Sequence, residues 1–275
     1  MMLRAEGKRV KSRYTLTPYP KIKHMEAYVK SEFHNGVTTI EFFHPQSNSL
    51  PGKILEKLAQ QIHGAGNDED TKVILLRSAG DKAFCAGASF DELASIKTKE
   101  QGLEFFSGFA HVINAMRKCP QFIIARIHGK CVGGGVGIAA AADYAIATEA
   151  AEIKLSELAV GIGPFVVGPV IERKTGVSAF SQLAIDAGMW RSAEWARRKG
   201  IYSELHTSNE SMDESIRRLI ENLVHSNPHA MAELKKIFWK GTEHWDQLLI
   251  ERAAISGRLV VSSFTKQAIA AFKKK

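Results

Sequence analysis

The sequence lacks several features that would place it in a membrane or an oxidising compartment. No uninterrupted apolar run reaches the roughly 18 residues that a membrane-spanning helix needs. Cysteine is scarce, and the three present, Cys85, Cys119 and Cys131, are odd in number and show no C-x-x-C spacing. This usage is typical of reduced thiols and argues against a disulfide framework or a zinc site. We therefore predict a cytoplasmic protein with no membrane partner.

Local signatures of other chemistries are also missing. The nucleophile motif G-x-S-x-G and the phosphate-binding motif G-x-x-x-x-G-K-[ST] do not occur. The dinucleotide fingerprint G-x-G-x-x-G is incomplete because Ile138 stands at its third glycine. His225 and His229 have H-x-x-x-H spacing, but Pro228 lies between them and no third ligand is evident. We predict no metal and no serine nucleophile.

The net charge of +8 is concentrated at the ends of the chain. Residues 1–24 hold seven basic side chains against Glu6, and the remaining residues carry only +2. Lys273, Lys274 and Lys275 exceed that remainder by themselves, so the body is close to neutral. This distribution argues against nucleic-acid binding by the globular part.

Residues 1–24 show neither strand alternation nor a helical stripe, and Pro18 and Pro20 interrupt them. We predict a basic disordered extension. Two origins stay open. Met25 is a sensible true start, which would make the segment a misassigned leader. The basic, acid-poor composition also suits a mitochondrial presequence, although a convincing apolar face is lacking.

The most informative stretch runs from Pro120 to Asp143. Phe122–Ile127 is apolar except for Arg126 and predicts a buried strand. Gly133, Gly134 and Gly135 follow, and the alanine-rich run after them predicts a helix that begins in the glycines. The first turn of a helix has unpaired N–H groups and the positive end of the macrodipole. The segment therefore suits a phosphate, a thioester oxyanion, or simply close packing of a helix on a strand.

A second strand–glycine–helix stretch covers residues 81–93, DKAFCAGASFDEL, with its turn at Gly87. Together, A-F-C-A-G-A-S and H-G-K-C-V-G-G-G-V-G resemble the crotonase superfamily, the enoyl-CoA hydratase/isomerase family. The resemblance covers roughly Glu26 to Lys275. It implies an α/β fold made of a spiral of strand–strand–helix repeats. It divides the chain into a core with the CoA and oxyanion site over 25–208 and a C-terminal helical trimerisation region over 209–275.

The resemblance also implies roles for particular residues. The substrate is an acyl-CoA thioester, with coenzyme A as part of the substrate and no separate cofactor. The backbone N–H groups of Ala88 and Gly134 would form an oxyanion hole, and S-E-L-A-V-G-I-G-P would carry the catalytic Glu157. A homotrimer or a dimer of trimers is implied. The expected substrate- and CoA-binding residues are Gln46, Ser49, Leu50, Ala86, Gly87, Gly133, Gly135, Pro164, Phe272 and Lys273. Gln46 stands where a basic residue is common in the family.

The residues around Glu157 bear on the reaction. Glu157 is the only acid in the apolar segment 154–168, where its charged form would be disfavoured, which suits a proton shuttle. The position of the family's first catalytic glutamate is Gly137, and Phe165 stands where dienoyl isomerases and dehalogenases carry another acid. We therefore predict a single-base shift of 3-enoyl-CoA to 2-enoyl-CoA.

Two alternatives stay open. An enoyl-CoA hydratase, including one for branched substrates, would need a second acid such as Glu92. A non-catalytic CoA- or RNA-binding protein is the alternative of another class. The motifs leave the acyl chain length and branching open.

Periodicity predicts the remaining elements. Strands are expected at 36–43, 72–76, 143–147 and 153–155, and helices at 51–62 and 103–117. Helix 103–117 would be core or the wall of an acyl pocket. Four further helices are expected at 211–224, 228–240, 244–256 and 258–273, separated in part by Gly241 and Gly257.

Overall fold

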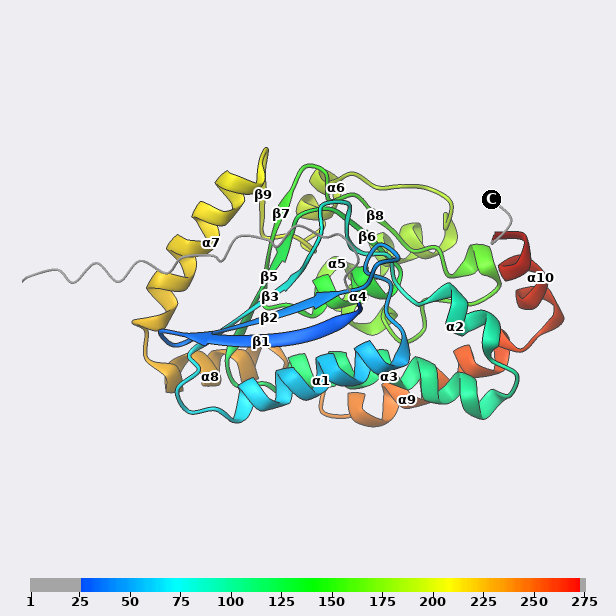
Figure 1. Cartoon of the computed structure of the whole chain (residues 1–275), viewed down its shortest axis with the longest axis horizontal. Coiled ribbons are helices and arrows are strands. Elements are labelled where there is room, and N and C mark those ends of the chain that lie inside the picture. The colour runs from blue at the N-terminus through cyan, green and yellow to red at the C-terminus, as the bar shows by residue number, and fades with distance from the viewer. Residues whose placement is uncertain (1–25, 273–275) are drawn as a thin grey trace, which may run out of the picture.

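The computed structural model describes residues 26–272 (Figure 1). Residues 1–24, Met25 and Lys273 lie outside this range, and the predicted extension falls there. A six-stranded sheet has the order β1-β2-β3-β5-β7-β9, and a three-stranded sheet has the order β4-β6-β8. The strands are β1 (Tyr28–His34), β2 (Val37–Phe43), β3 (Val73–Ser78), β4 (Ala83–Cys85), β5 (Phe122–Ile127), β6 (Lys130–Val132), β7 (Tyr144–Thr148), β8 (Ile153–Lys154) and β9 (Glu204–His206).

Consecutive strands alternate between the two sheets. β3 and β4, then β5 and β6, then β7 and β8 each give one strand to the large sheet and one to the small sheet. A helical segment follows each pair before the chain returns to the large sheet. All pairings are parallel except β1 with β2, because each return passes through a helical crossover. This confirms the predicted spiral of strand–strand–helix units.

Helices cover both faces of the large sheet. On one face α1, α3 and α9 lie side by side (Figure 1). On the other face α7 covers Val37, Leu75, Ile124 and Ile146. The helices are α1 (Gly52–Asn67), α2 (Phe90–Ser95), α3 (Lys99–Lys118), α4 (Gly134–Ala141), α5 (Gly168–Ile185), α6 (Ala193–Arg198), α7 (Asn209–Val224), α8 (Pro228–Phe238), α9 (Trp245–Val260) and α10 (Ser263–Phe272), with a 3-10 turn η1 (Leu158–Val160).

The predicted strands and helices are present, and one boundary is wrong. Gly257 does not end a helix, because it lies inside α9. A Cβ atom added at Gly102 of α3 would lie only 2.7 Å from the Gly257 Cα. The glycine therefore allows two helices to touch, and the break between α9 and α10 comes later, near Ser262. Strands β1, β6 and β9, helices α5 and α6, and the turn η1 were not predicted.

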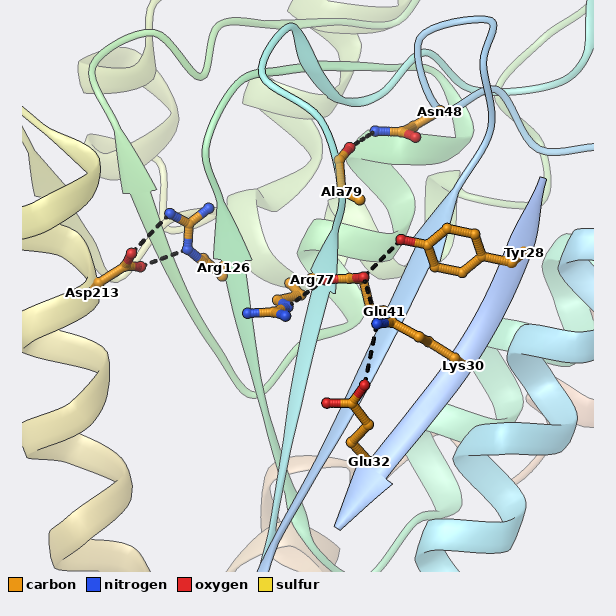
Figure 2. Close-up of polar contacts among 9 residues, drawn as sticks. All are labelled: Tyr28, Lys30, Glu32, Glu41, Asn48, Arg77, Ala79, Arg126 and Asp213. Atoms are coloured by element: carbon orange, nitrogen blue, oxygen red, sulfur yellow. Dashed lines mark hydrogen bonds and ion pairs between the residues drawn. The ribbon is translucent and has the colours of Figure 1, made fainter. Parts of the chain in front are cut away.

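Charged side chains buried in the large sheet are paired (Figure 2). Glu41 lies 2.7 Å from the Arg77 guanidinium and 3.4 Å from the Lys30 ammonium, and it accepts a 2.7 Å hydrogen bond from the Tyr28 hydroxyl. On the neighbouring strand Arg126 pairs with Asp213 of α7. These contacts tie β1, β2, β3, β5 and α7 together. No helix among residues 26–272 is long and apolar enough to cross a membrane.

Candidate active site

The candidate site lies where the small sheet ends. Strands β4, β6 and β8 are parallel, with Cys85 opposite Cys131 and Val132 opposite Lys154. Their carboxyl ends therefore meet at one edge, and the segments that follow carry Ala88, Gly134 and Glu157. All three residues line the same cavity. The sheet thus brings together the three catalytic positions that the sequence predicted from separate motifs.

The turn at Gly87 is paired with Leu50, and this pairing fixes the orientation of the Ala88 backbone N–H group. The Leu50 N–H donates to the Gly87 carbonyl oxygen at 2.7 Å, and the Ser89 N–H donates to the Leu50 carbonyl oxygen at 3.3 Å. This parallel bridge uses the groups on either side of Ala88, so the Ala88 N–H points away from Leu50. Gly87 has φ +85°, and a Cβ there would lie 2.7 Å from the Val132 carbonyl oxygen. Only glycine fits this position.

The second turn presents the start of α4. Gly133 has φ 51° and donates its N–H to the Lys154 carbonyl oxygen at 2.8 Å. Gly134 is the first residue of α4, where a backbone N–H has no partner within the helix. A Cβ added at Gly87 would lie 3.5 Å from the Gly134 nitrogen, so the two turns are in contact.

Close packing also requires these glycines. A Cβ at Gly134 would lie 2.1 Å from the Phe109 ring, and one at Gly135 would lie 2.6 Å from the Cys85 carbonyl oxygen. The glycine triplet therefore does allow a helix to pack closely on its neighbours, as one of the three interpretations expected. This packing is compatible with a Gly134 N–H that has no partner within the helix.

Glu157 follows β8, and its side chain lies beside the second turn. A Cβ at Gly133 would be 2.9 Å from the Glu157 Oε1 atom. The Oε2 atom is buried and has no hydrogen-bond partner among the residues that the structure describes. Burial disfavours the carboxylate and raises the pKa of Glu157 from 4.5 to about 7. The backbone is fixed by the Ile162 N–H, which donates to the Glu157 carbonyl oxygen at 3.0 Å.

The space beside Gly137, where the family's first catalytic glutamate would stand, is occupied by the side chain of Val167. A Cβ at Gly137 would lie 2.4 Å from the Cγ1 atom and 2.6 Å from the Cβ atom of Val167. Val167 is 4% exposed and lines the cavity. The glycine is therefore not beside an empty space that a carboxylate could enter, because the valine side chain already occupies it.

The cavity wall is otherwise apolar. Its polar side chains are Ser156, Glu157 and Ser256, and Glu157 is the only acid among the lining residues that the structure describes. Glu92, the expected second acid of a hydratase, accepts a 2.7 Å hydrogen bond from the Gly52 N–H at the start of α1. It does not line this cavity, so the structure gives no support to the idea that it enters from a loop. The apolar lining residues are Ala86, Ala88, Phe90, Leu93, Phe106, Phe109, Val132, Val160, Ile162, Pro164, Phe165, Val166 and Val167.

The expected CoA-binding residues divide into two groups. Ala86, Gly87, Gly133 and Pro164 line the cavity. Gln46, Ser49, Leu50 and Gly135 do not. The Gln46 amide donates to Asp91 at 2.7 Å, the Ser49 hydroxyl lies 3.0 Å from the His44 Nδ1 atom, and Leu50 is buried in its bridge to Ala88. The Phe272 side chain and Lys273 lie outside the described residues.

Helix α10 holds the segment after Glu157. The Thr265 hydroxyl donates to the Gly161 carbonyl oxygen at 3.0 Å. A Cβ at Gly161 would lie 2.6 Å from the Phe264 ring, so that ring covers the turn that follows η1. Several lining residues were not among the predicted site residues, and Val167 and Ser256 are two of them. Val167 comes from the same apolar segment as Glu157, and Ser256 comes from α9, far from the glycine motifs in sequence.

Comparison with known proteins agrees with this geometry. The family model for enoyl-CoA hydratase/isomerase matches residues 32–275. The chain is 29% identical over 194 residues to the carnitinyl-CoA dehydratase of Salmonella enteritidis PT4, an alignment covering 70% of this chain and 73% of the relative. The chain therefore belongs to the enoyl-CoA hydratase/isomerase family and is an acyl-CoA enzyme of the crotonase type.

Solved structures of low sequence identity share the fold. The enoyl-CoA hydratase from Bacillus halodurans superposes with a TM-score of 0.82 at 23% identity, covering 89% of this chain and 99% of that one. An enoyl-CoA hydratase from Mycobacterium avium gives a TM-score of 0.78 at 22% identity, covering 91% and 97%.

Proposed function

We propose that the protein moves the double bond of a 3-enoyl-CoA to the 2 position, with Glu157 as the single base. The observation that carries this proposal is that the site holds one carboxylate without a partner, Glu157, and has no room for a second one at Gly137. Glu157 Oε2 is buried and unpartnered among the described residues, and Val167 occupies the space at Gly137. The site therefore offers one acid–base group for the reaction.

The double-bond shift needs no more than this group. Glu157 takes a proton from C2, and the electron pair moves through the thioester to its carbonyl oxygen. The Ala88 and Gly134 N–H groups stabilise the resulting dienolate. The proton then returns from Glu157 to C4, which places the double bond between C2 and C3. A pKa near 7 suits both halves of this exchange, because the group must accept and donate at neutral pH.

Hydration is the second candidate, and the activities after which similar proteins are named favour it. One relative is a carnitinyl-CoA dehydratase, and both solved structures above are named as hydratases. Adding water requires activation of the water and delivery of a proton to the α carbon. In this chain Glu157 would have to supply both functions, since the cavity wall of the described residues holds no other acid.

The deciding experiment compares the wild type with Glu157→Gln on 3-enoyl-CoA and 2-enoyl-CoA. We expect the wild type to isomerise the first and to hydrate the second slowly. The isomerase rate of the Gln variant should be lower by a factor of about 10²–10⁴. Fast hydration without isomerisation would reject the single-base proposal, and isomerase activity retained by the Gln variant would reject Glu157.

We also propose a homotrimer or a dimer of trimers that forms through the C-terminal helical region. Leu219 and Leu223 pack against the core, and Trp239 is only 8% exposed. Within this region α8 carries exposed apolar side chains, among them Ile237, which is 65% exposed, and Phe238, which is 52% exposed. Light scattering at micromolar concentration should report a trimer or larger, and a monomer would contradict this.

A further inference from the structure

One hydroxyl group faces the cavity from α9. Ser256 is 1% exposed and lines the cavity, although it lies far in sequence from the motifs that build the site. A serine inside a helix commonly donates to the carbonyl four residues earlier. The Ser256 hydroxyl forms no such bond, and no hydrogen bond within residues 26–272 uses it. A hydroxyl in an otherwise apolar cavity wall, with no partner in the described residues, is free to hydrogen-bond water or a bound molecule in that cavity.

The packing of α3 gives the distance between this hydroxyl and the oxyanion turn. Phe109 contacts Gly134, and Gly102 contacts Gly257, the residue next to Ser256. Phe106, between them on the same helix, also lines the cavity. Residues 102, 106 and 109 lie on one face of α3, because they are spaced by four and three. Seven residues of helix span about 10 Å, so Ser256 lies on the order of 10 Å along α3 from the thioester position.

We propose that Ser256 hydrogen-bonds a neutral oxygen, a hydroxyl or a carbonyl, on the acyl chain several carbons beyond the thioester. This rests on the proposed function and narrows its substrate class to oxygen-substituted acyl-CoA thioesters. A charged group at that end is disfavoured, because the described lining residues include no lysine, arginine or histidine and the wall near Ser256 is apolar.

The test uses 3-enoyl-CoA substrates of increasing chain length, each with and without a terminal hydroxyl. At the matching length the wild type should prefer the hydroxylated substrate by about tenfold in kcat/KM, the effect of one neutral hydrogen bond. Ser256→Ala should abolish this preference. Ser107→Ala is the matched control, because Ser107 is a buried serine of α3 that does not line the cavity, and it should keep the preference.

Two results would overturn the inference: no preference in the wild type at any length, or a preference that survives in Ser256→Ala. If Ser256→Ala does not fold, Ser256→Cys preserves the shape with a weaker donor and should show a reduced preference. If no substrate is turned over, the proposed function fails separately. Calorimetric binding of saturated acyl-CoA, with and without the hydroxyl, then tests Ser256 alone, and equal affinities would reject its role.

Discussion

Each sheet of this enzyme positions a glutamate, and the two glutamates have opposite surroundings. Glu41 in the large sheet is 1% exposed and meets Arg77, Lys30 and Tyr28 (Figure 2). Glu157 at the end of the small sheet has a buried Oε2 atom with no partner in the described part of the chain. A buried carboxylate with its partners in place holds strands together. One without partners has a raised pKa and is available to exchange a proton.

The two sheets also differ in their apolar packing. Helices cover both faces of the large sheet, whereas the small sheet ends at a cavity. Beside this cavity Gly134, Gly135 and Gly137 of α4 touch Phe109, Cys85 and Val167, respectively. The glycine turns place Ala88 and Gly134 in the cavity wall while α4 stays in close contact with its neighbours.

The largest effect on stability is expected at Glu41. Glu41→Gln removes the counter-ion of Arg77, whose side chain is 4% exposed, and should lower the free energy of unfolding by about 3–5 kcal/mol. Urea denaturation measures this. Glu32→Gln is the matched control, because Glu32 pairs with Lys30 at 53% exposure and should cost less than about 1 kcal/mol. Equal losses in both variants would break the comparison between the two sheets.

A smaller loss is expected from placing an acid at Gly137. Gly137→Glu should lower the free energy of unfolding by about 1–3 kcal/mol, since its Cβ would overlap Val167. Adding Val167→Gly removes both overlapping atoms and should recover part of this stability. The double variant should also gain hydration of 2-enoyl-CoA, with Val167→Gly alone as the control. If Gly137→Glu alone is as stable as the wild type and hydrates, the space is not filled by Val167.

The pH dependence of the rate should follow Glu157. The base must be ionised, so kcat/KM for isomerisation should rise about tenfold per pH unit below 7 and level off above it. A pH–rate profile measures this between the limits at which the protein stays folded. A profile that levels off near the ordinary glutamate pKa of 4.5 would show that the carboxylate is not desolvated.

An effect on stability is also expected at alkaline pH. The pKa of Glu157 is higher in the folded than in the unfolded chain, so the folded form binds the extra proton between pH 4.5 and about 7. Protonation of Glu157 therefore favours the folded chain at low pH, and this contribution to the free energy of unfolding is lost as the pH rises through 7. Glu157→Gln should raise the unfolding temperature at pH 8 and change it little at pH 5. A lower unfolding temperature at pH 8 would mean that the carboxylate is paired.

Much of the site was predictable because its signals are local. Gly87 and Gly133 have positive φ at turns that follow short strands, and the sequence marks such turns directly. Glu157 could also be recognised, because it is the only acid in the apolar segment 154–168. Gly257 was misassigned because a glycine that ends a helix and one that lets two helices touch look the same in sequence. Val167 and Ser256 were missed because their contacts depend on how α3, α4 and α9 pack.

The most direct test of the single-base account follows one hydrogen. A 3-enoyl-CoA carrying deuterium at C2 should give a 2-enoyl-CoA with part of that deuterium at C4, since the buried Glu157 carboxyl takes the label and returns it before exchange with water is complete. Mass spectrometry and proton NMR of product from the first turnovers measure the transfer. Label at C4 in the wild type, with no product from Glu157→Gln, is the predicted result. Complete loss of the label to water, together with hydrated product, would contradict the account.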